Sequence, residues 1–277
     1  MVVFSAASMF LHDYSCQQIL GFFSAAGLDG IEFWPETPDF WQNGQDIKHL
    51  KELKKARPEL ASWTIHAPIL DMNPSSFNPG VAEISVGYAV KAVELAHDIG
   101  AQTVTIHPGR RTAKRPPTEA DLNLFDHYME CVHETSRTLG VTVCIENMEP
   151  AVNSLAYTPE RLREILDAEP WLGFTLDVAH AQIKDEMEPS RYIDLCGDRL
   201  LNVHMSRVVR NRPHSPISED PAIAEIIRHI KSTGFSGSLT LEIEDLTFDH
   251  VMTAEEKVEV LAQDCRFMRD CWAGKFT

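Results

Sequence analysis

Residues 103–109 read Thr-Val-Thr-Ile-His-Pro-Gly, and residues 142–147 read Thr-Val-Cys-Ile-Glu-Asn. Each stretch is a short run of β-branched and apolar residues that ends on an ionisable side chain. Such a run between two helical stretches predicts a buried strand of a parallel sheet. The ionisable residue is therefore expected where its strand ends, at the carboxyl edge of the sheet.

The same pattern recurs along the whole chain, with helical stretches between the strands, as expected of βαβ units. The chain has 277 residues, close to the roughly 250 of a (β/α)8 barrel. No linker or shift of composition divides it. We therefore predict an α/β protein with a single domain, a (β/α)8 TIM barrel made by residues 1–277. The predicted strands are Val2–Ala6, Gly30–Phe33, Ala61–His66, Thr103–His107, Thr142–Glu146, Gly173–Asp177, Leu200–His204 and Ser238–Glu242.

Helices are predicted between these strands, at Cys16–Ala26, Asp46–Ala56, Val81–Ile99, Glu119–Leu139, Pro159–Asp167, Arg191–Cys196, Pro221–Thr233 and Ala254–Trp272. Gly27, Gly100, Gly140 and Gly234 each follow a predicted helix, where a left-handed residue without a Cβ ends it well. The longer loops all leave the carboxyl ends of strands, the face on which barrel active sites form. They are Ala67–Asn78, Pro108–Thr118, Val178–Pro189 and Met205–Asp220.

A doubly wound open sheet is the alternative architecture for this pattern of strands and helices. The first strand-to-helix turn has no GxGxxG sequence, and a Rossmann nucleotide site needs those glycines for its tight turn and close approach to phosphate. A dinucleotide site of that kind therefore has no support.

Composition limits the partners of the chain. The formal net charge is −16, from 41 acidic and 25 basic residues, which disfavours binding of duplex nucleic acid because phosphate contacts require cations. No apolar run is long enough for a membrane span, and the first residues do not resemble a signal peptide. The six cysteines form no CxxC pair, so reduced thiols are expected. We expect a cytoplasmic protein without a membrane partner.

Six of the predicted strands end on, or just before, a side chain that can bind a metal ion. A barrel gathers its strand ends into one ring, so residues distant in sequence meet in a common pocket. Several carboxylates and imidazoles there need a compensating positive charge. Mixed imidazole and carboxylate ligands suit Zn, Mn, Fe or Co, and we expect one or two such ions. The candidate ligands are His66, His107, Glu146, Asp177, His204 and Glu242.

These motifs resemble the xylose isomerase-like TIM barrel superfamily. The resemblance rests on Gly-Leu-Asp-Gly-Ile-Glu-Phe, His-Ala-Pro, His-Pro-Gly, Ile-Glu-Asn, Leu-Asp-Val-Ala-His and a final Leu-Glu, spread over nearly the whole chain. Members of that superfamily include endonuclease IV, isomerases and epimerases of sugars and sugar phosphates, and hydrolases or lyases of small metabolites. The ordered set of motifs is specific to the superfamily and much less specific to one activity.

By resemblance to endonuclease IV, His66, His107 and Glu146 form a first metal site. Glu146 then bridges to a second ion, held also by Asp177, His204 and Glu242.

His180 and His214 resemble two ligands of the third metal ion of that enzyme. Arg212 stands where the endonuclease pattern has an aspartate, and a guanidinium beside two imidazoles makes a poor cation site. We therefore expect at most two tightly bound metals, with His180 and His214 free to contact the substrate.

Two of the loops at the predicted mouth are basic on an otherwise acidic protein. Their cations are Arg110, Arg111, Lys114 and Arg115 in one loop, and Arg207, Arg210 and Arg212 in the other. Solvated loop charge is the simpler interpretation, whereas the functional one is a positive funnel for a small anionic metabolite. Arg210 matches the spacing of a substrate-binding arginine in the epimerases of the superfamily. Glu32 is expected to contact a substrate hydroxyl or to pair with an arginine.

Four functions fit these observations, and we rank two of them almost equally. Metal-dependent hydrolysis of a phosphoester or phosphodiester in a small phosphorylated or nucleotide-like metabolite comes first, because His66 and His107 imply a second ion. Isomerisation or epimerisation of a sugar or sugar phosphate through an enediolate is the alternative, with Glu146 and Glu242 as catalytic carboxylates. Apurinic endonuclease action follows, disfavoured by charge. A barrel that only binds a ligand explains least.

Overall fold

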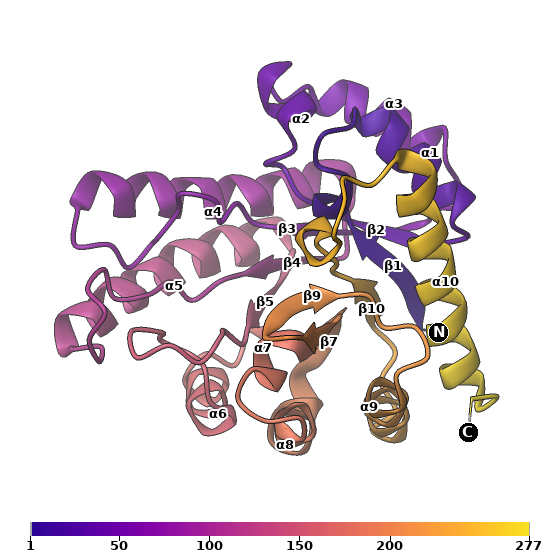
Figure 1. Cartoon of the computed structure of the whole chain (residues 1–277). Helices are drawn as coiled ribbons and strands as arrows, with labels where there is room; N and C mark the ends of the chain where they lie inside the picture. The colour runs from indigo at the N-terminus through magenta and orange to yellow at the C-terminus, as the bar shows by residue number, and fades with distance from the viewer. Residues whose placement is uncertain (1, 277) are drawn as a thin grey trace.

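The computed structural model describes residues 2–276 and shows a closed barrel of eight parallel strands (Figure 1). The order around the barrel is β1-β10-β7-β6-β5-β4-β3-β2, and β1 pairs with both β2 and β10 to close it. The predicted TIM barrel is therefore confirmed. Its strands are β1 (Val3–Ala7), β2 (Gly30–Phe33), β3 (Ser62–His66), β4 (Thr103–Ile106), β5 (Thr142–Glu146), β6 (Gly173–Asp177), β7 (Leu200–Met205) and β10 (Ser238–Leu241).

Helices surround the barrel and bury its outer face (Figure 1). The α-helices are α1 (Cys16–Ala25), α2 (Pro38–Gln42), α3 (Ile47–Lys55), α4 (Pro79–Ile99), α5 (Glu119–Leu139), α6 (Pro159–Ala168), α7 (Val178–Gln182), α8 (Glu188–Cys196), α9 (Pro221–Ser232) and α10 (Ala254–Ala273), with short 3-10 helices η1 (Ser8–Leu11), η2 (Gly197–Arg199) and η3 (Asp245–Thr247). Within residues 2–276, no helix is both long enough and apolar enough to cross a bilayer.

Four helix ends were predicted from glycine, and the backbone there has the expected left-handed geometry. Gly27, Gly100, Gly140 and Gly234 have φ angles of 76°, 64°, 68° and 80°. A side chain would be strained in that conformation, which explains why glycine stands at each of these positions.

Two of the loops at the mouth have more structure than the sequence predicted. Helix α7 begins directly after Asp177, whose Oδ1 accepts a hydrogen bond from the backbone N–H of His180 at 2.6 Å and caps the helix. The loop after β7 folds into an antiparallel pair, β8 (Arg207–Val209) and β9 (Arg212–Ser215). Helix α8 also begins at Glu188, three residues before its predicted start.

The inside of the barrel is polar below the mouth, which sets the surroundings of the strand ends. Alternate residues of a strand face the same side, so Asn202 in β7 lies one step below His204. Asn202 Oδ1 accepts a hydrogen bond from Thr240 Oγ1 at 2.8 Å, and Thr240 Oγ1 lies 2.8 Å from Ser5 Oγ. These side chains are buried. A hydrogen-bonded layer therefore supports the residues above it.

Candidate metal centre

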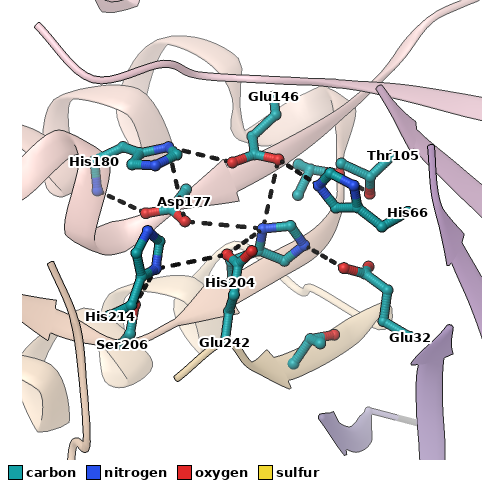
Figure 2. Close-up of polar contacts among 12 residues, drawn as sticks. Glu32, His66, Thr105, Glu146, Asp177, His180, His204, Ser206, His214 and Glu242 are labelled. Atoms are coloured by element: carbon teal, nitrogen blue, oxygen red, sulfur yellow. Dashed lines mark hydrogen bonds and ion pairs between the residues drawn. The ribbon is translucent and has the colours of Figure 1, made fainter. Parts of the chain in front are cut away.

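Four side chains from neighbouring strands converge at the mouth of the barrel (Figure 2). Glu146 ends β5, Asp177 ends β6, His204 lies in β7 and Glu242 directly follows β10. Each offers one nitrogen or oxygen atom, and the four atoms lie within 4.8 Å of one another. All four side chains are buried. Residues up to 96 positions apart in sequence (146 to 242) thus share one pocket, as the closed barrel requires.

His66 and His107 form a second group with Glu146. The Nε2 atoms of His66 and His107 lie 3.4 and 3.2 Å from Glu146 Oε2. His66 Nδ1 lies 2.8 Å from the backbone oxygen of Ala67, so Nδ1 carries a proton, and Nε2 faces Glu146 Oε2, where a cation could take the place of the Nε2 proton. The ring of Trp34 stacks on His66 with centroids 3.9 Å apart. Packing and hydrogen bonding thus orient this imidazole.

Asp177 forms a third group with His180 and His214, whose potential ligand atoms also lie within 4.8 Å of one another. The rings of the two histidines meet edge to face with centroids 5.2 Å apart. We expected Arg212 to place its charge beside them. Instead, its side chain is exposed and its guanidinium donates to the backbone oxygen of Leu246 at 2.6 Å. The guanidinium thus has a backbone partner outside this group, and the expectation of at most two tightly bound metals stays a prediction.

The buried polar atoms of the four-residue pocket described first, at the ends of β5, β6, β7 and β10, fit a divalent cation. Glu146 Oε1, Asp177 Oδ2, His204 Nδ1 and Glu242 Oε2 are buried without a hydrogen-bond partner in the described chain. A buried, unpaired polar atom costs free energy, and a shared cation would remove that cost at several atoms together. One imidazole and three carboxylates suit Mn, Co, Fe or Zn better than a soft metal.

In the protein without a cation, the pKa values of the pocket residues are shifted in different directions. Burial raises the pKa of Asp177 to about 7, despite the nearby histidines. Burial also acts to raise the pKa of Glu146, but the neighbouring His107 and His204 outweigh it and bring the pKa well below its usual value. For His204, burial is outweighed by Glu242 and Glu32, and its pKa is raised well above the ordinary value. In the absence of a metal ion, protons therefore balance the carboxylates.

Glu32 is not available to a substrate, contrary to the expectation from its strand-end position. Its side chain is 0% exposed, beneath His204, and its Oε1 atom lies 2.8 Å from His204 Nε2 (Figure 2). Its Oε2 atom accepts hydrogen bonds from Asn202 and Thr64. The predicted arginine pair is absent from the described contacts as well. The side chain of Glu32 points inward from β2, and this places its carboxylate inside the barrel.

A cleft of about 660 Å³ opens beside the cluster, with His107 and His180 in its wall. Loops after β3, β4 and β5, together with residues of α4 and α5, line the rest of it. Arg110 and Lys114 line it as well, so two of the predicted loop cations lie where an anionic ligand could reach them. A site of this volume accommodates a small metabolite.

The other basic residues of the loops lie elsewhere. Arg111 contacts Asp121 at 3.7 Å, and Arg207 donates to Asp220 at 2.7 Å. Arg210 is exposed in the turn between β8 and β9, with a φ of 52°, and does not line the cleft. The predicted contact of Arg210 with substrate has no support in this geometry, because the hairpin turn carries the residue away from the cleft.

Asn147 is a positioning residue that we did not predict. Its Oδ1 accepts a hydrogen bond from the backbone N–H of Asp177 at 2.8 Å, and its Nδ2 donates to the backbone oxygen of Asp177 at 2.9 Å. It thereby joins the end of β5 to the end of β6 and sets the spacing of Glu146 and Asp177. The motif Ile-Glu-Asn contained this signal, since the amide directly follows the ligand.

Comparison with protein families matches residues 21–271 to the xylose isomerase-like TIM barrel. The chain belongs to this family. The match covers most of the chain and confirms the resemblance inferred from the strand-end motifs.

Among relatives of this xylose isomerase-like chain, a protein of Methanocaldococcus jannaschii described as uncharacterised is 31% identical over 271 residues. That alignment covers 97% of this chain and 98% of the relative. A probable endonuclease 4 of Petrotoga mobilis is 22% identical over 181 residues, or 61% of this chain and 62% of that protein. The crystal structure of a D-tagatose 3-epimerase-like protein has a TM-score of 0.75, with 23% identity and 97% and 98% coverage. At that identity the structural likeness shows a common fold.

Proposed function

We propose that the protein is a divalent-metal-dependent isomerase or epimerase of a sugar or sugar phosphate. One observation carries this proposal: two buried carboxylates, Glu146 and Glu242, face the same cation pocket from different sides. Their strands, β5 and β10, are separated in the barrel by β6 and β7, and Figure 2 shows the two carboxylates approaching His204 and Asp177 from above and below. A substrate carbon between them would be reachable by a base on either face.

The residues divide the chemistry between binding and proton transfer. Glu146, Asp177, His204 and Glu242 would hold the ion, which supplies polarisation of a substrate carbonyl. One of the two glutamates takes the proton from the carbon beside the carbonyl, and the other gives a proton to the opposite face of that carbon. The electron pair left by the departing proton is shared with the carbonyl oxygen until the second proton arrives, so the configuration inverts with no net change in atoms. A positioned base of this kind contributes about 10²- to 10⁴-fold to a rate.

The comparisons support this class of reaction over the hydrolysis that we ranked first from sequence. The structure reported for a D-tagatose 3-epimerase-like protein spans 97% of this chain, and another similar structure is titled 3-keto-D-glucoside 4-epimerase. Relatives named as probable endonuclease 4 are also found. The formal charge of −16 disfavours a duplex substrate, so we do not propose nuclease activity.

The reaction predicts incorporation of solvent deuterium. We expect one deuterium at the carbon that changes configuration when the manganese- or cobalt-loaded protein turns over D-tagatose, D-fructose or D-allulose, free or phosphorylated, in D₂O. The reason is that a glutamate proton exchanges with solvent before it returns. NMR of the product measures the label, and chelator-treated protein is the control. Turnover of such a sugar with no label at that carbon would contradict the proposed proton transfer.

A second candidate function is hydrolysis of a phosphoester, favoured by the group of His66, His107 and Glu146. Glu146 belongs to this group and to the four-residue pocket, so two ions bound there would share one carboxylate. Paired ions can activate a water molecule and neutralise a phosphoryl group, chemistry for which a single-ion isomerase does not need the two histidines. Arg110 and Lys114 in the adjacent cleft suit a phosphate in either reaction.

Metal counting separates the two groups. We expect wild-type protein to bind two ions per chain and the double variant His66→Ala/His107→Ala to bind one, because the variant loses both imidazoles of the group with Glu146, whereas the four-residue pocket keeps all its ligands. Elemental analysis of protein loaded with zinc or manganese gives the count, and His49→Ala on α3 is a control.

The activity of that double variant then decides the function. Retained sugar isomerisation with one ion supports the main proposal, whereas loss of phosphodiesterase activity measured on bis(p-nitrophenyl) phosphate supports hydrolysis. If the double variant still bound two ions, His66 and His107 would not be ligands of the second ion.

A further inference from the structure

The buried carboxylate of Glu32 has no part in the reaction described above, although it lies directly under the pocket. It comes from β2, across the barrel from β7, and its side chain is completely buried. Burial of an ionised carboxylate is costly unless its oxygens are satisfied. Oε2 accepts hydrogen bonds from Asn202 Nδ2 at 2.7 Å and Thr64 Oγ1 at 3.3 Å. Oε1 lies 2.8 Å from His204 Nε2 as an ion pair, and neither atom has a hydrogen-bond partner among the described residues.

The two nitrogens of His204 face different surroundings (Figure 2). Nδ1 points into the pocket, 2.8 Å from Glu242 Oε2 and 3.5 Å from Glu146 Oε2. Nε2 points away from the pocket, at Glu32. A neutral imidazole carries its proton on one nitrogen and a lone pair on the other, and only the lone pair can bind a metal ion.

We propose that Glu32 is a positioning residue that keeps the ring proton of His204 on Nε2, so that Nδ1 presents its lone pair to the cation pocket. A carboxylate has no proton to donate, so its negative charge 2.8 Å from Nε2 favours a proton on that nitrogen and thereby sets the tautomer. Carboxylates placed behind ligating histidines act in this way in metal sites generally. This inference shares with the proposed function the presence of a cation, and it is independent of which reaction follows.

The hydrogen bonds around Glu32 predict what an amide would do there. Asn202 must present its NH₂ group to a carboxylate, and its oxygen accepts from Thr240 Oγ1. In Glu32→Gln the two donors, Asn202 and Thr64, select the amide oxygen at the Oε2 position. The NH₂ group then falls at the Oε1 position and donates to His204 Nε2, which moves the ring proton to Nδ1 and blocks the ligand atom.

A compensating change should restore the tautomer without restoring the carboxylate. In Glu32→Gln/Asn202→Asp the aspartate accepts from the glutamine NH₂ group, so the glutamine oxygen turns to His204 and again accepts from Nε2. The double variant has the same formal charge as the wild type. It therefore separates the direction of one hydrogen bond from the total charge of the layer.

The decisive measurement is the position of the His204 proton in zinc-loaded protein, from ¹⁵N-¹H correlation NMR of its imidazole, with the signal assigned by its absence in His204→Asn. We expect a proton on Nε2 in the wild type and in the double variant, and none on Nε2 in Glu32→Gln. Calorimetric titration with Mn²⁺ or Zn²⁺ should show affinity weakened by about 10- to 100-fold in Glu32→Gln and recovered in the double variant.

The control is Glu188→Gln in α8, which removes another buried carboxylate, paired with Lys184 and Arg191, and should leave metal affinity unchanged. Retention of the Nε2 proton or of full affinity in Glu32→Gln would overturn the proposal. The proposal would also be overturned if Glu32→Gln/Asn202→Asp bound metal as weakly as Glu32→Gln while it melted at the wild-type temperature. If the wild type binds no metal, the proposed function fails, whereas wild-type binding that is unchanged in Glu32→Gln fails this inference alone.

Discussion

Glu146→Gln is expected to lower kcat/KM for the sugar reaction by at least about 10³-fold, since general base catalysis alone contributes about 10²- to 10⁴-fold. Glu146 is the residue that the four-residue pocket and the His66 group have in common. Its Oε2 atom lies within 3.5 Å of three imidazoles, those of His66, His107 and His204. An amide in its place removes a negative charge from both groups and a base from the reaction.

Steady-state kinetics and elemental analysis on the same preparation measure the two losses separately. Glu164→Gln is the matched control, because Glu164 is exposed on α6 and, among residues 2–276, pairs with Arg161 alone. Glu242→Gln should lower the rate comparably but spare the ion of the His66 group, to which Glu242 does not belong. A Glu146→Gln protein with wild-type metal content and rate would exclude Glu146 from the centre.

Removal of the metal should abolish turnover and lower the melting temperature by roughly 10 °C. The unpartnered atoms of Glu146, Asp177, His204 and Glu242 are satisfied by the ion in the native state only. A ligand present at 1,000 times its Kd stabilises a protein by about 4.1 kcal/mol, and each kcal/mol shifts the melting temperature of a chain of this size by about 2–4 °C. Thermal unfolding with and without a chelator measures the difference, and Glu146→Gln should show a smaller one.

The pH dependence of this stabilisation follows from Asp177. In the cation-free protein its pKa is raised to about 7 by burial, above the ordinary value near 3.8, so its ionisation disfavours the native state and removes stability as pH rises from about 4 to 7. The metal binds the ionised form. The gain in melting temperature on adding metal should therefore be larger at pH 8 than at pH 6, and an equal gain at both would contradict this role of Asp177.

The strand ends show how far the sequence reaches. Runs such as Thr-Val-Thr-Ile-His and Val-Cys-Ile-Glu are long enough to be strands and end on ligand types, so their residues could be assigned to one ring as soon as a closed barrel was predicted. The convergence of Glu146, Asp177, His204 and Glu242 needs only strand order and the shared direction of parallel strands. Local signals also sufficed for helix ends, because the glycines there satisfy a backbone requirement that is independent of tertiary contacts.

The sequence did not predict how the loops at the mouth fold or where individual side chains point. A spacing of six residues after His204 placed Arg210 near the substrate, but β8 and β9 form a hairpin whose turn exposes it. Sequence also gave no sign that the Arg212 guanidinium bonds to the carbonyl of Leu246, 34 residues away along the chain.

By itself, the sequence determined the barrel, its longer helices and the ligand types at its mouth, because periodicity and strand ends are local properties of the chain. Only the tertiary structure decided that Glu32 lies under His204 and that Asn147 joins β5 to β6. These roles depend on which atoms of distant strands come within hydrogen-bonding distance, and such distances are set by barrel closure and packing.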